Sequence, residues 1–336
     1  MTASDQTALF LTSDDVDGLA TMPEYVETVR DGYRDRGHGA PARPRTRLYA
    51  EAPAGILTGY TAILPTVGAM GGYTYAAGFG STDAHFVLGL FDAESGDPLA
   101  ILDGASLNPF KTGATGGVAI DELAPPRADD LALFGSGPQA RAQLTAATAV
   151  RDIERVEVYS PTPEHRTSFA GEMNGQLDAT VAAVATPSAA VEGADIVVTA
   201  TDASEPVFDG SMLEPGMHVT TMGQYHPDKR EVDDTTVERA TYVPDLSERV
   251  MNDAGAFIHA VESGVVSEDD IHAELGAIVA GTERGRTSED EITLFDSGGT
   301  AIETVAAGQM LYERARERGL GQEIEFAPAS EALTGR

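Results

Sequence analysis

The chain has 336 residues and a formal net charge of −32, from 54 acidic and 22 basic side chains. It contains no cysteine, which excludes disulfides, thiolate metal sites and cysteine nucleophiles. So large a negative charge argues against nucleic acid as a partner, and no apolar run reaches the ~18–20 residues that a membrane helix needs.

The length predicts two domains, because single hydrophobic cores stop growing at roughly 250–300 residues. Met1–Asp5 lacks the basic segment and apolar run of a secretory signal, so we expect a cytoplasmic protein. Acids are scattered along the chain, and the only lysines are Lys111 and Lys229. This composition favours adaptation to a high-salt cytoplasm, where salt screens the repulsion; the alternative is a merely acidic protein.

The first third of the chain is predicted to be rich in strands. A helix-start signal at residues 12–15 precedes amphipathic spacing that continues to Tyr33, and a Gly/Pro-rich break follows at 38–44. The runs that resemble strands are 45–49, 55–64, 73–77, 85–91 and 99–102, of which the last two flank a turn and predict a hairpin. A helix of small residues is expected at about 105–122.

From Asp130 onward, strands alternate with helices, which predicts a parallel sheet. The expected strands are 131–134, 156–159, 180–184, 195–200 and 218–222, and the expected helices are 138–150, 163–175 and 188–193. A last helix, 300–318, follows a strand at 291–295 and is expected to pack back on the first domain. The predicted fold is therefore α/β, with a strand-rich α/β domain at 1–118 plus 300–336 and a Rossmann-type parallel sheet domain at 119–299.

The strongest local motif is the turn Gly135-Ser136-Gly137-Pro138-Gln139-Ala140, directly after an apolar strand and directly before a helix. The first glycine allows the tight turn, the second lets a pyrophosphate approach the backbone, and Ala140 keeps the helix close to the strand. The amino end of the helix favours anions. We therefore predict a dinucleotide site of the NAD(P) type here; the alternative is a plain turn.

The next strand end is expected to select the cofactor, since an acid there would bind the 2′-hydroxyl of NAD. This chain instead has Ser160, Thr162 and, beyond them, Arg166, while Glu157 lies within the strand. Hydroxyls and a cation suit a 2′-phosphate, so the pattern favours NADP over NAD.

Two groups of cations are candidates for binding an anion. Lys111 lies among small and apolar residues, where it either binds an anion or extends its ammonium to water. Arg43, Arg45 and Arg47 alternate along a predicted strand and share one face, which is either an anion site or a solvated edge.

A series of short motifs follows one another from about Pro41 to Gly321. They are 101–104 leading into 111–114, 135–140, 194–201, 215–219, 222–223, 285–286 and 292–299. In this shared order the chain resembles the ornithine cyclodeaminase/mu-crystallin family, which also holds an archaeal alanine dehydrogenase.

The resemblance implies a homodimer with a Rossmann domain and a separate substrate/dimerisation domain. It implies that Arg45 and Lys111 bind a substrate carboxylate, with Lys111 in place of a family arginine. Thr74 stands where the family has a lysine, and Tyr225 stands where it has an acid, so the family's cyclodeaminase chemistry lacks two of its groups. Tyr225 and the neighbouring His226 are then the candidates for proton transfer, since histidine titrates near neutrality.

We expect hydride transfer between a nicotinamide and the carbon of an amino acid or imine, as in an amino acid dehydrogenase or ketimine reductase. Lys111, Tyr225 and His226 are the catalytic candidates, and Thr199, Thr201 and Gly223 are expected to line the nicotinamide side. No metal is expected. The alternatives are an ornithine cyclodeaminase, which forms proline and ammonia, and a non-enzymatic mu-crystallin-like protein that binds NADP(H) and a small ligand.

Overall fold

The computed structural model describes residues 6–81, 83–223, 225–327 and 329. Residues 1–5, on which the expectation about a signal rests, lie outside the described residues. So do residues 328 and 330–336 of the C-terminal segment. The chain forms two compact units. Unit 1 comprises Met1–Thr21, Gly39–Asn108 and Thr300–Arg336, and unit 2 comprises Met22–His38 and Pro109–Gly299.

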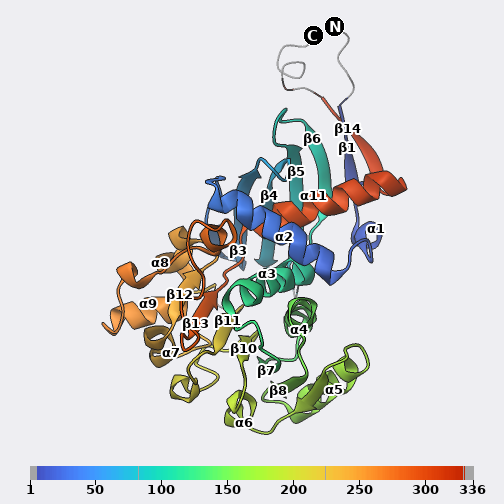
Figure 1. The fold of residues 1–336 in the computed structure, drawn as a ribbon. Coiled ribbons are helices and arrows are strands. Elements are labelled where there is room, and N and C mark those ends of the chain that lie inside the picture. The colour runs from blue at the N-terminus through green and yellow to red at the C-terminus, as the bar shows by residue number, and fades with distance from the viewer. Residues whose placement is uncertain (1–5, 82, 224, 328, 330–336) are drawn as a thin grey trace. The chain divides into compact units, whose positions relative to one another are not determined.

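Unit 1 is built on a seven-stranded sheet in the order β14-β1-β6-β5-β4-β3-β2 (Figure 1). Only the β1–β6 pair is parallel among these neighbours, and β5 and β6 form the predicted antiparallel hairpin. The strands are β1 (Gln6–Leu11), β2 (Thr46–Glu51), β3 (Ala54–Leu64), β4 (Ala69–Gly78), β5 (His85–Asp92), β6 (Pro98–Asp103) and β14 (Gln322–Phe326).

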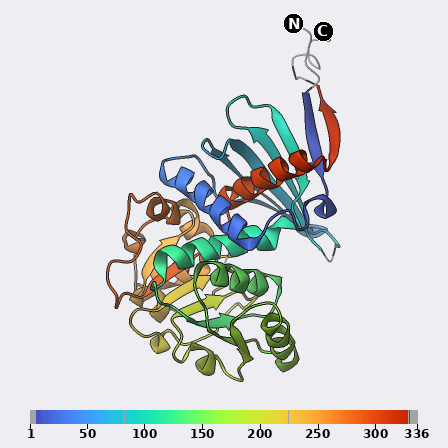
Figure 2. The same ribbon diagram turned by 45° about the vertical axis from the view of Figure 1, so that its right-hand side comes forward.

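Helix α11 (Ala301–Arg318) covers one face of this sheet (Figure 2). It packs so closely that a Cβ added at Gly308 would lie 2.5 Å from a methyl carbon of Leu88. The last helix thus groups with the strand-rich unit 1. Burial alternates along β3, so the covered face holds Tyr60 and Leu64, while the other face carries exposed apolar side chains.

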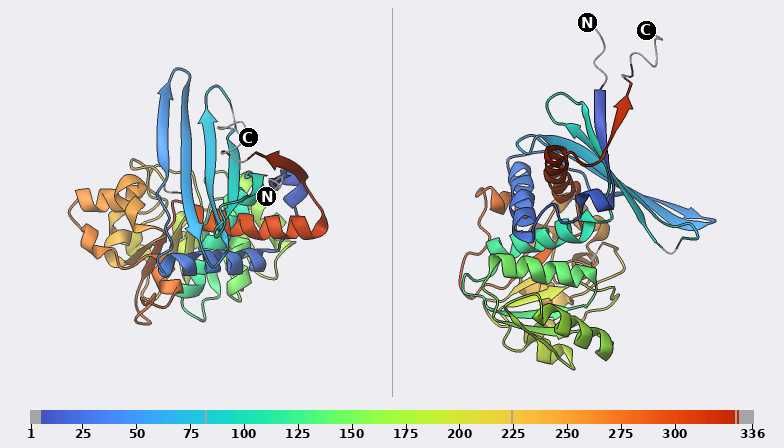
Figure 3. Two further views of the ribbon diagram at one scale, coloured as in Figure 1. Left: turned by 90° about the horizontal axis from the view of Figure 1, so that it is seen from above. Right: turned by 90° about the vertical axis from the view of Figure 1, so that its right-hand side faces the viewer.

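Unit 2 contains the predicted parallel sheet, which lies among its helices (Figure 3). Its strands follow the order β12-β13-β11-β10-β7-β8-β9. All six pairs of neighbours are parallel. The strands are β7 (Asp130–Phe134), β8 (Arg155–Tyr159), β9 (Thr180–Ala183), β10 (Ile196–Thr199), β11 (His218–Thr221), β12 (Thr241–Pro244) and β13 (Thr293–Asp296). Strands β10, β11 and β13 are buried along their whole length, as expected for a sheet covered on both faces.

The helices of unit 2 include the predicted crossover helices after β7, β8 and β9. They are α2 (Met22–Gly37), α3 (Leu107–Leu123), α4 (Pro138–Val150), α5 (Pro163–Asn174), α6 (Pro187–Val191), α7 (Asp234–Arg239), α8 (Val250–Asp253), α9 (Gly255–Glu262) and α10 (Leu275–Val279). Because parallel strands end at one edge, the segments after β7, β8, β10 and β11 gather there.

Three assignments differ from the sequence-based ones. The signal at Thr12 does cap a helix, but that helix is the short α1 (Ser13–Val16), and Gly18 then turns the chain with a φ of +65° before α2 begins. Residues 22–38 group with unit 2, because α2 packs on α10 and α4, where Arg36 pairs with Glu274 at 2.8 Å. Residues 109–118, placed in the first domain from the sequence, also group with unit 2.

Candidate active site

The turn after β7 has the geometry that a pyrophosphate site requires. Gly135 has a φ of +117°, and a Cβ there would lie 2.4 Å from the carbonyl oxygen of Ala200, so only glycine fits. Gly137 is the N-cap of α4, and no atom of the described residues lies within 4 Å of where its Cβ would be. Pro138 begins the helix and no side chain caps it, so the amino end of α4 is open to an anion.

The structure brings three of the predicted cofactor residues together at the end of β8. The Ser136 hydroxyl donates to the Ser160 hydroxyl at 3.2 Å, and Arg166 donates to the carbonyl oxygen of Ser160 at 2.7 Å. The Arg166 guanidinium also lies 5.7 Å from the centre of the Tyr159 ring. A cation therefore lies at the strand end, whereas Glu157 is paired in mid-strand between β7 and β9.

Thr162 and Gln139 occupy the flanks of this region. Thr162 is the N-cap residue of α5, and its carbonyl oxygen accepts a hydrogen bond from Ser160 at 3.4 Å. The side-chain oxygen of Gln139 is buried and has no hydrogen-bond partner among the described residues. An orphaned acceptor beside the glycine turn fits a site that a polar ligand completes.

Arg141 is a residue of this region that the sequence analysis missed. It donates to the carbonyl oxygen of Ser136 at 2.9 Å and forms a two-point ion pair with Glu172 on α5, at 2.9 and 2.5 Å. It thus fastens the turn to the next helix. Its signal in the sequence is the spacing of four residues from Gly137, on the first turns of α4.

At the ends of β10 and β11, a buried carboxylate joins the three residues predicted to line the nicotinamide side. Glu231 accepts hydrogen bonds from the hydroxyls of Thr199 and Thr201 at 2.8 and 2.6 Å. It also accepts from the amides of Thr201 and Gly223 at 2.7 and 3.0 Å. Burial raises the pKa of Glu231, and these donors act against that rise. The sequence analysis did not select Glu231, because an acid in a polar segment is usually on the surface.

The two proton-transfer candidates lie on the segment between β11 and Glu231. Tyr225 is 48% exposed, and the His226 Nδ1 accepts a hydrogen bond from the amide of Asp228 at 3.2 Å. Both side chains are therefore open enough to meet a ligand. Their catalytic role stays a prediction.

The substrate-binding candidates are divided between the units. Lys111 is the fifth residue of α3, lies in unit 2 and is 2% exposed, so it is not a lysine that extends its ammonium to water. In unit 1, the Arg45 guanidinium lies 5.5 Å from the centre of the Tyr60 ring. Tyr60 pairs with Tyr73 across β3 and β4, whereas Thr74 is paired with Gly59 and is exposed on the opposite face. The structure therefore does not bring Thr74 beside Arg45.

Three carboxylates gather at the other edge of the parallel sheet, away from these residues. Asp129, Asp130 and Asp195 place ligand atoms within 4.8 Å of one another. However, Asp195 accepts hydrogen bonds from the amides of the other two at 3.0 and 3.2 Å, and Arg155 pairs with Asp130 at 2.8 Å. These contacts account for the cluster as a structural tie between β7 and β10. The expectation of no metal stays a prediction.

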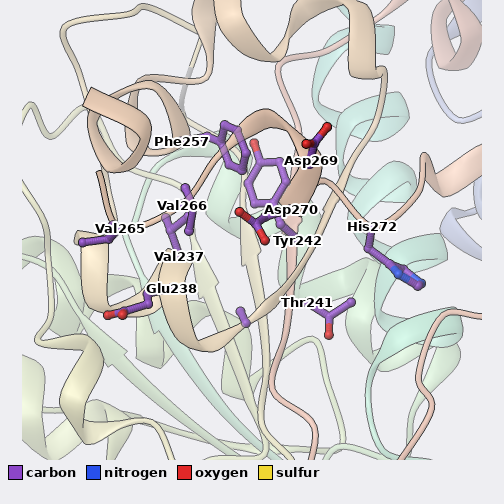
Figure 4. Close-up of a pocket in the computed structure, with 11 residues that line it drawn as sticks. Val237, Glu238, Thr241, Tyr242, Phe257, Val265, Val266, Asp269, Asp270 and His272 are labelled. Atoms are coloured by element: carbon purple, nitrogen blue, oxygen red, sulfur yellow. The ribbon is translucent and has the colours of Figure 1, made fainter. Parts of the chain in front are cut away.

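Two cavities of unit 2 lie apart from the predicted site residues. One, of about 370 Å³, lies beside the edge strand β12, where the Tyr242 and Phe257 rings meet with their centres 4.3 Å apart (Figure 4). The other, of about 530 Å³, is lined by Arg151, Arg284 and Arg286 among others. Neither includes a predicted site residue. A search of the described residues for a helix long and apolar enough to cross a membrane found none.

The comparisons with known proteins agree with this geometry. The model of the ornithine cyclodeaminase/mu-crystallin family matches residues 6–319. The Delta(1)-pyrroline-2-carboxylate reductase of Bacillus cereus is 38% identical over 238 residues, which are 70% of this chain and 73% of that protein.

Two solved structures share the fold over nearly the whole chain. The Delta(1)-pyrroline-2-carboxylate reductase of Thermococcus litoralis, in complex with NADH and L-proline, has a TM-score of 0.88 and 34% identity over 94% of this chain and 100% of that chain. An archaeal alanine dehydrogenase dimer with bound NAD also has a TM-score of 0.88, with 30% identity over 96% of this chain and 100% of that chain.

Proposed function

Since the chain belongs to the ornithine cyclodeaminase/mu-crystallin family, we propose that it reduces a small cyclic imine that carries an α-carboxylate, with Δ1-pyrroline-2-carboxylate as the first candidate and L-proline as the product. The family and the fold class predicted from the sequence are confirmed. The chain is an NAD(P)-dependent oxidoreductase of the imine and amino acid type, as its relatives indicate. The particular imine is the proposal.

The observation that carries this function is the turn between β7 and α4. At Gly135 no residue larger than glycine fits, whereas the space over Gly137 is open and no side chain caps the helix that follows. A pyrophosphate placed there directs the rest of a dinucleotide along the carboxyl edge of the sheet, toward the segments after β10 and β11. The bound nicotinamide supplies the hydride.

Side chains of this protein would bind the substrate and donate the proton. We assign the substrate carboxylate to Arg45 and Lys111, because the resembled family places cations at both positions and Lys111 is buried. We assign proton donation to the imine nitrogen to Tyr225 or His226, since both lie within three residues of Gly223 along the chain. Holding the substrate by its carboxylate orients the imine carbon and lowers the entropic barrier of the transfer.

NADP is the cofactor that we propose. Arg166 lies at the end of β8 beside Ser160, and the stretch Tyr159-Ser160-Pro161-Thr162 carries no acid that would bind a ribose 2′-hydroxyl. A guanidinium and hydroxyls are the groups that a 2′-phosphate prefers. The two solved relatives described above contain NADH and NAD, so the proposal of NADP rests on this chain's own residues at the end of β8.

Ornithine cyclodeamination is the less favoured alternative. The lysine and the acid of the resembled family are replaced here by Thr74 and Tyr225, and Thr74 lies on the exposed face of the unit 1 sheet. The reaction would release ammonia without net change in the cofactor. A binding protein without catalysis would show neither ammonia nor cofactor oxidation.

One assay separates these functions. Purified protein in molar KCl is given NADPH or NADH with Δ1-pyrroline-2-carboxylate, and NAD⁺ with L-ornithine. We expect stoichiometric cofactor oxidation with the imine and no ammonia from ornithine. Ammonia release without net cofactor change would establish the lyase, and binding without turnover would establish the third alternative. Arg45→Ala and Lys111→Ala should each lower kcat/KM roughly 10- to 100-fold, with cofactor affinity retained.

We also propose that the protein is a homodimer through the uncovered face of the unit 1 sheet. That face carries large exposed apolar side chains on four strands, β1, β2, β3 and β5, and such a patch is unusual on a monomer surface. They are Phe10, Leu48, Leu57, Ile63, Val87 and Phe91. Light scattering should give twice the chain mass for the wild type and the chain mass for Leu57→Glu.

The acidic surface is proposed to be an adaptation to high salt. Lysine is nearly absent, and acids are exposed in both units, which keeps the protein hydrated and soluble where salt screens the repulsion. The cytoplasmic location expected from the sequence stays a prediction.

A further inference from the structure

Glu231 connects three points of the backbone that are far apart in the sequence. Its Oε1 accepts from the amide and the hydroxyl of Thr201, just beyond β10. Its Oε2 accepts from the hydroxyl of Thr199, at the end of β10, and from the amide of Gly223, just beyond β11. One carboxylate therefore receives four hydrogen bonds of 2.6–3.0 Å from the ends of two adjacent strands.

The surroundings of Glu231 leave little freedom. The residue is fully buried, and a Cβ added at Gly223 would lie 2.5 Å from the carbonyl oxygen of Thr201 and 2.9 Å from the Glu231 carboxylate carbon. The backbone of Glu231 is itself fixed, because its carbonyl oxygen accepts from the amide of Val207 at 2.8 Å. The segments after β10 and β11 are thus held at backbone contact.

The Glu231 carboxylate also holds the two ends of the segment that carries Tyr225 and His226. That segment leaves β11 at Gly223, whose amide bonds to Glu231, and it returns to the core at Glu231. Both of its ends are therefore fixed by one side chain, while between them Tyr225 is exposed and His226 is half-buried.

The hydrogen bonds require an acceptor at both oxygens. An ionised carboxylate offers acceptors only, and all four groups directed at it are donors. A glutamine of the same shape would set its NH₂ group against two of these donors, which leaves buried polar groups unsatisfied.

We infer that Glu231 is a positioning residue for hydride transfer. It holds the segments after β10 and β11 in the one arrangement that orients the nicotinamide end of the cofactor and the Tyr225–His226 pair. This inference rests on the proposed function. It assigns to Glu231 no contact with the reacting atoms.

The test compares Glu231→Gln with wild type in three measurements: kcat and KM for the imine, the Kd of NADPH, and the Kd of 2′-phospho-ADP-ribose, which lacks the nicotinamide. A positioning role predicts that kcat falls on the order of 10- to 100-fold, because small misplacements of reacting groups are costly. The Kd of NADPH should rise severalfold, while the Kd of 2′-phospho-ADP-ribose should stay within twofold.

Asp233→Asn is the matched control. Asp233 lies two residues away and also accepts three hydrogen bonds, from Gly210 and Thr236, but these bonds tie α7 and not the strand ends. It should lose thermal stability without a change in kcat. If Glu231→Gln does not fold, Thr201→Val removes one of the four donors and should show the same pattern at smaller amplitude.

The outcomes are distinct. A Glu231→Gln protein with wild-type kcat, or one that weakens NADPH and 2′-phospho-ADP-ribose equally, would overturn the positioning role. A wild-type protein that binds neither nicotinamide cofactor would overturn the proposed function, and the role of Glu231 with it.

Discussion

The two glycines of the β7–α4 turn should respond to substitution in opposite ways, because the structure gives them different surroundings. Gly137 has an ordinary φ of −88° and open space where a Cβ would be, so Gly137→Leu should change the free energy of unfolding by no more than about 1 kcal/mol. The leucine would occupy the pyrophosphate position. Losing two charge-assisted hydrogen bonds of roughly 1.5–3 kcal/mol each predicts at least about 100-fold weaker NADPH binding.

Gly135→Ala is the matched variant, and its defect should be in stability. A positive φ at a non-glycine residue costs on the order of 1–3 kcal/mol, and the 2.4 Å approach to Ala200 forces a backbone shift of similar cost. Calorimetric titration with NADPH and thermal melts of the three proteins separate the two effects. If Gly137→Leu binds NADPH as wild type does, the turn is not the cofactor site; a Gly135→Ala melt equal to wild type would contradict the steric argument.

Three further predictions follow from charge and burial. Arg166→Ala should raise the Kd of NADPH roughly 10- to 100-fold and the Kd of NADH less than about threefold. Arg155→Ala, at the other end of β8, should alter neither Kd. Equal losses of affinity for both cofactors would refute the 2′-phosphate assignment. The Tm should rise by on the order of 10 °C from 0.1 M to 3 M KCl as the charge of −32 is screened, and a flat response would show that the acids are compensated locally. Burial, Arg286 and Arg151 lower the pKa of His218 to about 3, below its unfolded value of 6.5, so the unfolded state takes up the proton first as the pH falls. His218 should therefore contribute a fall in the free energy of unfolding that approaches about 1.4 kcal/mol per pH unit as the pH drops well below 6.5, and His218→Asn should remove this contribution in denaturant titrations at pH 5–7.

The parallel sheet could be read from the sequence because its signals are local. Helix α4 begins at Pro138 and ends at Val150, as predicted, since a glycine turn precedes it and the pattern of small and apolar residues is continuous. The predicted strands of this domain agree with β7–β11 to within one residue at either end. Each of these elements is specified by residues close to it in the chain.

Elements that depend on distant partners were missed. Strand β14 alternates charged and apolar residues and is ordered by pairing with β1, more than 300 residues earlier. The break between α1 and α2 was hidden because amphipathic spacing continues across Gly18. No spacing pattern in the sequence predicts that residues 22–38 belong to unit 2. They group with it because α2 packs on α10.

The candidate site shows the same division. Gly135, Gly137, Ser160 and Arg166 were predictable, because a strand, a turn and a helix in sequence fix where they lie. Glu231 was not, since its burial follows from two adjacent strand ends that approach each other only in the folded sheet.

The most direct test of the proposed function measures the transfer of deuterium from NADPH to the product. NADPH that carries deuterium at C4 in the transferred position is incubated with the protein and Δ1-pyrroline-2-carboxylate in molar KCl, and the product is examined by mass spectrometry and NMR. The account predicts L-proline with one deuterium at Cα for each NADPH oxidised. Proline without deuterium, or no proline while NADPH remains bound and unoxidised, would contradict it.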